Sequence, residues 1–427
     1  MFESSLLLLT GLGAVVVGLT AAILIVWRDL APVARLTPAG RVGLVVALGG
    51  GVIAFAIKLT VIETLSLTGR ERLAPVLTAP EPVDPGPRIE VGRPLWQPLP
   101  LEAPAPADNP TTPEKVALGA KLFFDTELSR DRTLSCASCH DLEAAAGGDG
   151  RATARGIDGQ IGTRNTPTVW NAAFQARLFW DGRARSLEDQ ALGPIANPIE
   201  MGADLGEVVS RLRARADYRE AFARAFGAEA AIDETAVARA LAAYERTLIT
   251  PDAPFDRFLR GDRTALSAQQ IRGMSLFETV GCVVCHAGPG FSRASLLAPE
   301  GGSAAFRLFP SLPSRYETTY RLTEDRGAAK SGRAGLWRVP SLRNVALTGP
   351  WFHNGAVDDL AEVVRIMATV QAGRAVGDGP VATEVEWSAE SGRLTRRTPS
   401  PLREADVDDI VAFLKALSSD RLVAARR

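Results

Sequence analysis

Two long apolar runs open the chain, and each has the length of a membrane-spanning helix. Residues 5–27 contain no charged side chain, and 42–64 form a second run of similar length; about 20 apolar residues suffice to cross a bilayer core of about 30 Å. The connection between the runs holds three arginines and one acid, so the positive-inside rule places it in the cytoplasm and both chain ends outside. The pattern predicts a transmembrane helical hairpin over 1–66. The alternative is a cleaved signal peptide, but the first run lacks a basic start.

Beyond the anchor, the apolar pattern becomes that of a helical globular protein. Residues 67–110 are rich in proline and predict an extended, semi-stiff spacer. Apolar residues then recur at helical spacing in segments near 113, 233, 267, 360 and 407, whereas strand-like alternation is scarce. Thr112, Asp233 and a capping box of Ser267 and Gln270 are the predicted starts of the first three of these helices. The glycine-rich stretches 146–165 and 286–340 predict ordered loops. The fold class is therefore expected to be mainly α.

Length and outline repetition divide the globular part in two. The chain has 427 residues, which exceeds the size of a single hydrophobic core. A helix, a Cys-x-x-Cys-His motif and a loop follow one another near 113–165 and again near 267–330. We expect two related domains in tandem, 111–250 and 251–427, each built round one cofactor. The net charge is −1, so no basic excess indicates a nucleic-acid partner.

The two Cys-x-x-Cys-His motifs predict covalent c-type haem attachment. They use all four cysteines and two of the three histidines: Cys136, Cys139 and His140, and Cys282, Cys285 and His286. Two thiols on one turn reach the two vinyl groups of a porphyrin, and the adjacent histidine becomes the proximal iron ligand. A four-cysteine zinc site or a disulfide in each pair are the alternatives. The histidine after each pair favours haem, and hence a mainly α fold of two cytochrome c-like domains behind the anchor.

The candidates for the ligand on the other side of each haem iron can be reduced by elimination. Between His140 and Trp170 there is no His, Met, Cys, Lys or Tyr. We therefore expect the first haem to be open to peroxide or oxygen, and the second to store electrons. For the second haem, His353 and Met367 are the realistic candidates, although either residue alone would more often be structural.

The chain resembles bacterial di-haem cytochrome c peroxidases and the related MauG proteins. The resemblance covers most of 110–418 and rests on runs such as LGAKLFFDTELSRDRTLSCASCH, RNTPTVWNAAF and FWDGRARSLEDQALGPIANPIEMG. It implies that Glu200 is the acid-base residue of the first haem, with Gln190 beside it, and that Trp180 lies between the haems. It also implies that Met367 is the axial ligand of the second haem. A calcium site is implied at the side chain of Asn165 and the carbonyls of Thr348 and Pro350.

Two departures from the family pattern bear on function. Many family peroxidases carry a distal histidine where this chain has Gly156 and Ile157, and MauG carries a tyrosine where it has Met367. The sequence thus combines an open first haem with a peroxidase-like second haem. The expected activity is reduction of hydrogen peroxide with electrons from a small cytochrome c or copper protein. The alternatives are a MauG-like oxidase of a partner protein, and a membrane-tethered electron carrier or redox sensor.

The anchor and the haem type together predict the location. Haem of this type is attached outside the cytoplasm, so we expect a bacterial inner-membrane protein with its catalytic domains in the periplasm. The two N-terminal helices would bind the membrane, and family analogy implies a homodimer.

Overall fold

In the computed structural model, the described residues are Thr37 and the ranges 95–298, 305–377, 384–388, 393–397 and 401–426. Apart from Thr37, the predicted transmembrane hairpin lies outside them, as does the spacer before residue 95. Among the helices of the described part, none combines the length and apolar character needed to cross a bilayer. The chain divides into two units, Met1–Glu81 and Pro82–Arg427, and the second is described here by itself.

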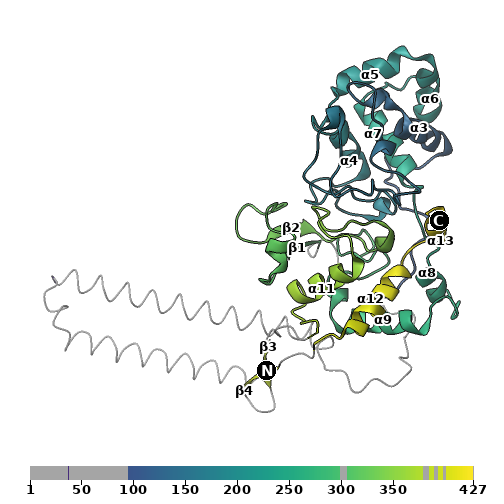
Figure 1. Ribbon diagram of the computed structural model, residues 1–427. Helices are drawn as coiled ribbons and strands as arrows, with labels where there is room; N and C mark the ends of the chain where they lie inside the picture. The colour runs from purple at the N-terminus through teal and green to yellow at the C-terminus, as the bar shows by residue number, and fades with distance from the viewer. Residues whose placement is uncertain are drawn as a thin grey trace. The chain divides into compact units, whose positions relative to one another are not determined.

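One group of helices lies at the upper end of this unit in Figure 1. It consists of α3 (Pro113–Phe124), α4 (Leu187–Ala196), α5 (Leu205–Ala214), α6 (Ala216–Phe226) and α7 (Glu234–Glu245). Two predicted start signals are confirmed, because the side chains of Thr112 and Asp233 accept hydrogen bonds from the first turns of α3 and α7. Helices α3 and α7 touch at Gly119, where a Cβ atom would lie 2.0 Å from Ala240 O.

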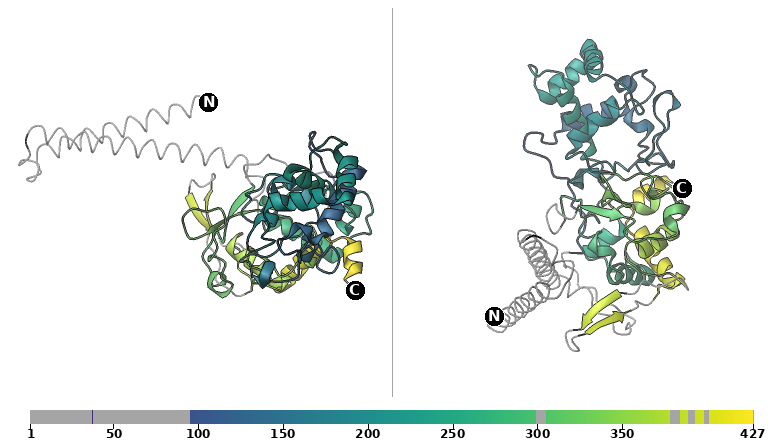
Figure 2. Two further views of the ribbon diagram at one scale, coloured as in Figure 1. Left: turned by 90° about the horizontal axis from the view of Figure 1, so that it is seen from above. Right: turned by 90° about the vertical axis from the view of Figure 1, so that its left-hand side faces the viewer.

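A second group lies at the other end (Figures 1 and 2). It consists of α8 (Pro254–Leu259), α9 (Ala268–Thr279), α11 (Leu360–Val370) and α12 (Glu404–Lys415). Helix α13 (Asp420–Ala425) lies between the two groups (Figure 1). Ser267 and Gln270 form the predicted capping box at the start of α9. The contact between α9 and α12 repeats that of α3 and α7, since a Cβ atom on Gly273 would lie 1.8 Å from Asp409 O. The prediction of a mainly helical fold is confirmed.

Short elements lie between the helices, and some of them fall within the two stretches that were expected to be loops. Four-residue strands β1 (Phe306–Phe309) and β2 (Gly335–Arg338) pair antiparallel, with Phe306 opposite Arg338. A second antiparallel pair joins β3 (Glu384–Ser388) to β4 (Arg393–Arg397). The short helix α10 (Tyr316–Thr319) lies between β1 and β2. Single 3₁₀ turns complete the described elements: η2 (Thr126–Leu128), η3 (Cys136–Ser138), η4 (Ile157–Gly159), η5 (Ala172–Phe174), η6 (Cys282–Val284) and η7 (Val345–Leu347).

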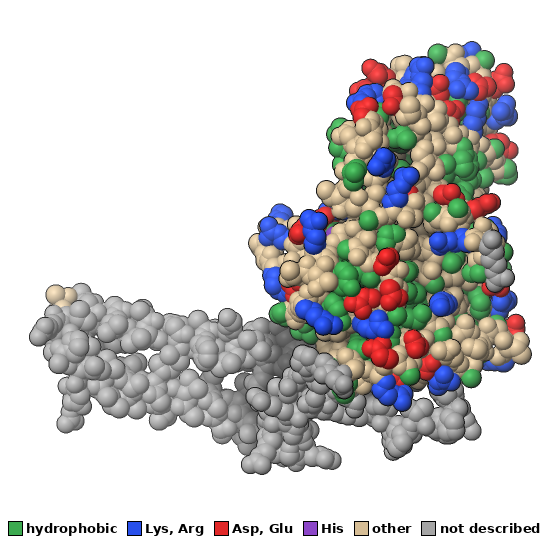
Figure 3. Space-filling view, in the orientation of Figure 1, with side chains coloured by type: hydrophobic (Ala, Val, Ile, Leu, Met, Phe, Trp, Pro, Cys, Tyr) green, Lys and Arg blue, Asp and Glu red, His purple; other side chains and the backbone are tan. Residues whose placement is uncertain are grey.

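Two large hydrophobic cores follow the two helix groups, but each takes one residue from the far end of the chain. The core of α3–α7 also contains Leu422, which is 1 % exposed and belongs to α13. The core of α8, α9, α11 and α12 contains Trp96, which is 3 % exposed and packs on Phe255 and Phe413. The described part of the predicted spacer therefore packs onto the folded body. Acidic and basic side chains are interspersed over the face seen in Figure 3.

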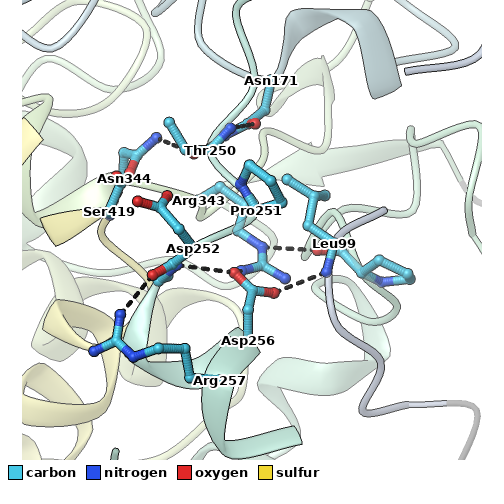
Figure 4. A network of polar contacts seen from close by, with 12 residues as sticks. Leu99, Asn171, Thr250, Pro251, Asp252, Asp256, Arg257, Arg343, Asn344 and Ser419 are labelled. Carbon is cyan, nitrogen blue, oxygen red and sulfur yellow. Dashed lines mark hydrogen bonds and ion pairs between the residues drawn. The ribbon is translucent and has the colours of Figure 1, made fainter. Parts of the chain in front are cut away.

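A buried polar network joins segments that are distant in sequence (Figure 4). Asn171 and Thr250 exchange two hydrogen bonds, from Asn171 Nδ2 to Thr250 Oγ1 (2.7 Å) and from Thr250 N to Asn171 Oδ1 (2.9 Å). Asn344 Nδ2 donates to the same Oγ1 at 3.0 Å, and Ser419 N donates to Asn344 Oδ1 at 3.0 Å. Because all four residues are buried, these bonds fix the loops between the cores.

The same region holds a fully buried ion pair. Arg343 Nη1 lies 2.8 Å from Asp256 Oδ2, and both side chains have 0 % exposure. Asp256 Oδ1 also accepts from Leu99 N at 2.8 Å, while Arg343 Nε donates to Pro289 O at 2.8 Å. Each charge thus has further partners, which a buried pair requires if it is to offset its desolvation.

Candidate active site

The first Cys-x-x-Cys-His motif lies on a tight turn that brings its two cysteines close together. Cys136 O accepts hydrogen bonds from Cys139 N (3.2 Å) and His140 N (2.9 Å). Ser135 N donates to Ser138 Oγ at 2.9 Å, which closes the start of the turn. The prediction that this spacing brings two thiols and a histidine together is in line with this geometry.

The second motif repeats these bonds. Cys282 O accepts from Cys285 N (3.2 Å) and His286 N (2.9 Å), and Gly281 precedes the turn with φ +98°. No disulfide joins the two cysteines of either pair in the structure. Among the described residues, no three His, Cys, Asp or Glu side chains converge on a metal position, so a four-cysteine zinc site is not formed either.

Both histidines have the form that iron ligation requires. His140 Nδ1 donates to Gly147 O at 2.9 Å, and His286 Nδ1 donates to Phe291 O at 3.0 Å, which leaves each Nε2 for a metal. Burial lowers the pKa of both rings, that of His286 to about 4, so both are neutral near pH 7. Burial also raises the pKa of the Cys136 thiol to about 12. A thioether carries no ionisable proton, so these residues fit a covalently attached haem.

Glu200 lies beside the first motif, on a loop whose backbone is hydrogen-bonded to the segment of Gly156 and Ile157. Ile157 N donates to Glu200 O at 2.7 Å, and a Cβ atom on Gly156 would lie 2.0 Å from Ile199 O. The Glu200 carboxylate interacts electrostatically with Cys139, which places it near the first haem site. Asn197 Nδ2 donates to Glu200 Oε1 at 2.7 Å. The structure therefore brings together the predicted acid-base residue and the first motif.

Partial burial shifts the pKa of Glu200. Desolvation raises the pKa of this carboxyl group above its ordinary value, and the hydrogen bond from Asn197 and the charge of Arg183 only partly oppose it. A raised pKa makes the carboxylate a stronger base, which suits a group that accepts a proton and then returns it. Gln190 lies on α4, the helix that ends at Asn197, and is partly exposed.

Trp180 connects the first helix group to β2. Its Nε1 donates to Asn165 O at 2.8 Å, and its carbonyl accepts from Arg338 N at 3.0 Å. Trp180 and Met367 are both partly buried against one aromatic cluster that includes Trp337. The structure thus brings two of the predicted residues, Trp180 and Met367, to the same cluster.

His353, the other ligand candidate, packs against Trp337, and its Nε2 is buried with no hydrogen-bond partner among the described residues. Its ring stacks on Trp337 at a centroid distance of 4.1 Å, and it is 2 % exposed. Its carbonyl accepts from Asn165 N at 2.7 Å. Burial lowers the pKa of His353 to about 4.

The residues of the implied calcium site lie on two neighbouring loops. Asn165 Nδ2 donates to Arg151 O at 2.8 Å. The backbone N–H of Asn165 donates to the carbonyl of His353 on the other loop. Thr348 ends η7, and Pro350 follows Gly349 through a cis peptide bond. The loops approach closely, since a Cβ atom on Gly355 would lie 2.1 Å from Ala152 O.

Two charged residues near the motifs were not predicted from the sequence. Glu245 is buried on α7 and interacts with Cys136, and burial raises the pKa of its carboxyl group to about 8. The burial of Glu245 could have been predicted from the sequence. Val237, Leu241 and Glu245 follow one another at four-residue spacing, which places Glu245 on an otherwise apolar stripe of the helix. Arg338 is 7 % exposed at the end of β2, and no local pattern singles it out.

Comparison with known proteins identifies the family. A family model for di-haem cytochrome c peroxidase matches residues 113–264. Cytochrome c551 peroxidase of Pseudomonas aeruginosa is 37 % identical over 331 residues, which is 76 % of this chain and 84 % of that protein. Cytochrome c peroxidase Ccp of Escherichia coli is 38 % identical over 320 residues, 74 % of this chain, and the match spans 60 % of that longer protein.

MauG proteins and solved structures show the same relationship. Methylamine utilization protein MauG of Methylophilus methylotrophus is 37 % identical over 273 residues, 62 % of this chain and 76 % of that protein. The crystal structure of a MauG-like protein associated with microbial copper homeostasis superposes with a TM-score of 0.61 at 31 % identity, over 80 % of this chain and 98 % of that one. The family is one of oxidoreductases with two c-type haems, which matches the two motifs found here. The chain belongs to the di-haem cytochrome c peroxidase and MauG family.

Proposed function

We propose that this protein reduces hydrogen peroxide to water at a haem held by Cys136, Cys139 and His140, with electrons that enter through a second haem. The observation that carries this proposal is the partly buried carboxyl group of Glu200 beside the first motif. A haem bound there supplies the redox-active iron at which the O–O bond is broken. The overall reaction consumes one peroxide, two electrons and two protons and yields two waters.

Residues of the protein accept and donate the protons of the reaction. Glu200 takes a proton from one peroxide oxygen and returns it to the other, which turns a poor leaving group into water. The hydrogen bond from Asn197 Nδ2 fixes which carboxyl oxygen faces the substrate. Gln190, on the helix that leads to Asn197, is assigned as a second polar group of the pocket.

The electrons are assigned a path through the second site. Cys282, Cys285, His286 and Met367 would hold the second haem, and the thioether of Met367 would favour reduced iron. Trp180 contacts the cluster that contains Met367 and hydrogen-bonds to Asn165 from the first half of the chain, so we assign it the transfer between the haems. The donor would be a small cytochrome c or copper protein, in keeping with the names of the relatives.

The remaining assignments concern organisation. The two cores support a division into haem domains 111–250 and 251–427. The backbone bond from Asn165 to His353 supports a calcium ion that is held by Asn165, Thr348 and Pro350 and keeps these loops in place. An inner-membrane anchor over 1–66, a periplasmic location and a homodimer complete the proposal, on the strength of the sequence pattern and family analogy.

A MauG-like oxidation of a partner protein is the second candidate. Gly156 packs on the backbone of Ile199 where many relatives carry a distal histidine, and the solved MauG-like structure supports this candidate. Rapid peroxide turnover with a reduced cytochrome c or copper protein would favour the peroxidase. Oxidation of a co-expressed protein without such turnover would favour the MauG-like activity.

The decisive experiment is electron paramagnetic resonance of the resting and half-reduced holoprotein, followed by addition of peroxide. We expect a high-spin ferric signal from the first haem and its rapid loss with peroxide. Two low-spin signals that persist after one-electron reduction would contradict the enzymatic proposal and favour an electron carrier or redox sensor.

A further inference from the structure

Three arginine side chains are buried among the described residues, and one of them has no carboxylate partner. Arg246 (6 % exposed) forms an ion pair with Glu188, and Arg343 (1 % exposed) forms one with Asp256. Arg338 (7 % exposed) has no acidic side chain of the described residues within ion-pair distance. A buried guanidinium is stable only with an anion or a full set of acceptors, so the environment of Arg338 requires explanation.

The guanidinium of Arg338 is fixed on one side. Its Nε donates to Phe179 O at 2.9 Å, and its Nη1 donates to Gln175 Oε1 at 3.2 Å. Burial lowers the pKa of Arg338 to about 10, and no acidic group opposes this shift. Gln175 Nε2 is also buried without an acceptor in the described structure. Two neighbouring side chains thus hold spare hydrogen-bond donors and a positive charge.

These donors lie next to the loop that carries the second axial histidine. Ser292 Oγ donates to Val339 O, the residue after Arg338, at 2.6 Å. His286 contacts the carbonyls of Phe291 and Pro340, two residues beyond Arg338. A Cβ atom on Gly290 would lie 3.9 Å from Gln175 Nε2. Both donors therefore lie beside the loop that begins at the second Cys-x-x-Cys-His motif.

We propose that Arg338 and Gln175 form a carboxylate-binding site that takes one propionate of the haem attached at Cys282 and Cys285. A planar guanidinium suits a carboxylate because it can donate two parallel hydrogen bonds. The site links the haem to the first half of the chain, because Gln175 and Phe179 precede the second motif by about a hundred residues. It also ties the propionate to the segment of Trp180, whose carbonyl accepts from Arg338 N.

The inference rests on the proposed haem at the second motif, and its test needs no peroxide. The holoprotein and its Arg338→Gln variant are titrated potentiometrically from pH 5 to 9, with each haem followed optically. Loss of the cation is expected to lower the reduction equilibrium constant of the second haem about tenfold, which is ~59 mV for one electron. The propionate pKa rises without its cation, so the potential also becomes pH-dependent in this range. Arg338→Lys restores most of both effects.

Controls separate this site from its rivals. Arg333→Gln removes an exposed cation just before β2 and is expected to change neither quantity. Gln175→Leu is expected to shift the potential of the second haem by a smaller amount in the same direction. This variant tests the proposal if Arg338→Gln fails to incorporate haem. The proposal is overturned if the potential and its pH profile do not change, or if both haems shift equally. It is also overturned if added chloride reproduces the variant's shift in the native protein, because the site then binds an inorganic anion.

Discussion

Replacement of Glu200 by glutamine tests the proton-transfer assignment most directly. The two side chains have nearly the same shape, and the hydrogen bond from Asn197 Nδ2 to Oε1 can form with either. The backbone bond from Ile157 N to Glu200 O is unaffected by the side chain. The variant therefore removes the titratable proton while it leaves the loop in place.

The expected loss follows from the chemistry of a positioned acid-base group. Such a group contributes roughly 10²- to 10⁴-fold to rate, which is about 2.7 to 5.5 kcal/mol of transition-state stabilisation at 1.36 kcal/mol per tenfold. The partly buried carboxyl group of Glu200 has a raised pKa, so the native rate falls as the pH falls through that pKa. The rate of the glutamine variant should not show this fall at low pH. Folding stability moves the other way, because a raised pKa means that stability present at low pH is lost as the pH rises.

The assay combines kinetics with a fold control. Single-turnover reaction of the half-reduced protein with peroxide, followed by stopped flow from pH 5 to 8, reports the chemical step. Thermal unfolding at neutral pH should show a variant at least as stable as the native protein, because the introduced glutamine carries no charge that must be buried. A rate within about threefold of the native rate, with the same fall at low pH, would refute the role of Glu200 as an acid-base group.

Three further predictions concern the side chains of Met367, Glu245 and Asp256. Met367→Leu is expected to cost less than about 1.5 kcal/mol of stability and to lower the reduction potential of the second haem. An unchanged potential in a redox titration would contradict the assignment of Met367 as a ligand of that haem. Glu245 has a pKa of about 8 against an ordinary 4.5, so Glu245→Gln should add about 3 kcal/mol of stability at pH 7 and almost none at pH 4; urea unfolding that shows equal gains at both pH values excludes this cause. Asp256→Ala leaves Arg343 buried and unpaired and should cost about 3 to 5 kcal/mol. The double variant with Arg343→Met should recover much of that loss in the same unfolding assay.

The sequence predicted those features that local pattern encodes. Apolar spacing and capping residues placed α3, α7 and α9 correctly, since Thr112, Asp233 and Ser267 each satisfy backbone groups within one turn. The two Cys-x-x-Cys-His motifs were found because their chemistry depends on residues within one turn. The position of Glu200 beside the first motif came from family resemblance and not from periodicity.

Features that depend on distant residues escaped prediction. Strands β1 and β2 are four residues long and stabilise each other across a long connection, so neither carries enough alternation to be recognised. The buried role of Arg338 depends on Gln175 and on the carbonyl of Phe179, which come from the other half of the chain. Nothing in the residues around Arg338 specifies partners at such a separation.

The placement of Trp96 and Leu422 constrains how the protein can be made. Each core is completed by a residue from a distant part of the chain, because Leu422 belongs to the α3–α7 core and Trp96 belongs to the other core. As the chain emerges, the α3–α7 core lacks one of its residues until the segment of Leu422, far beyond α7, has followed. Until then this core stays incompletely packed and open to enzymes that act on unfolded polypeptide. A gene cut between the two halves would yield fragments that each lack a closing residue.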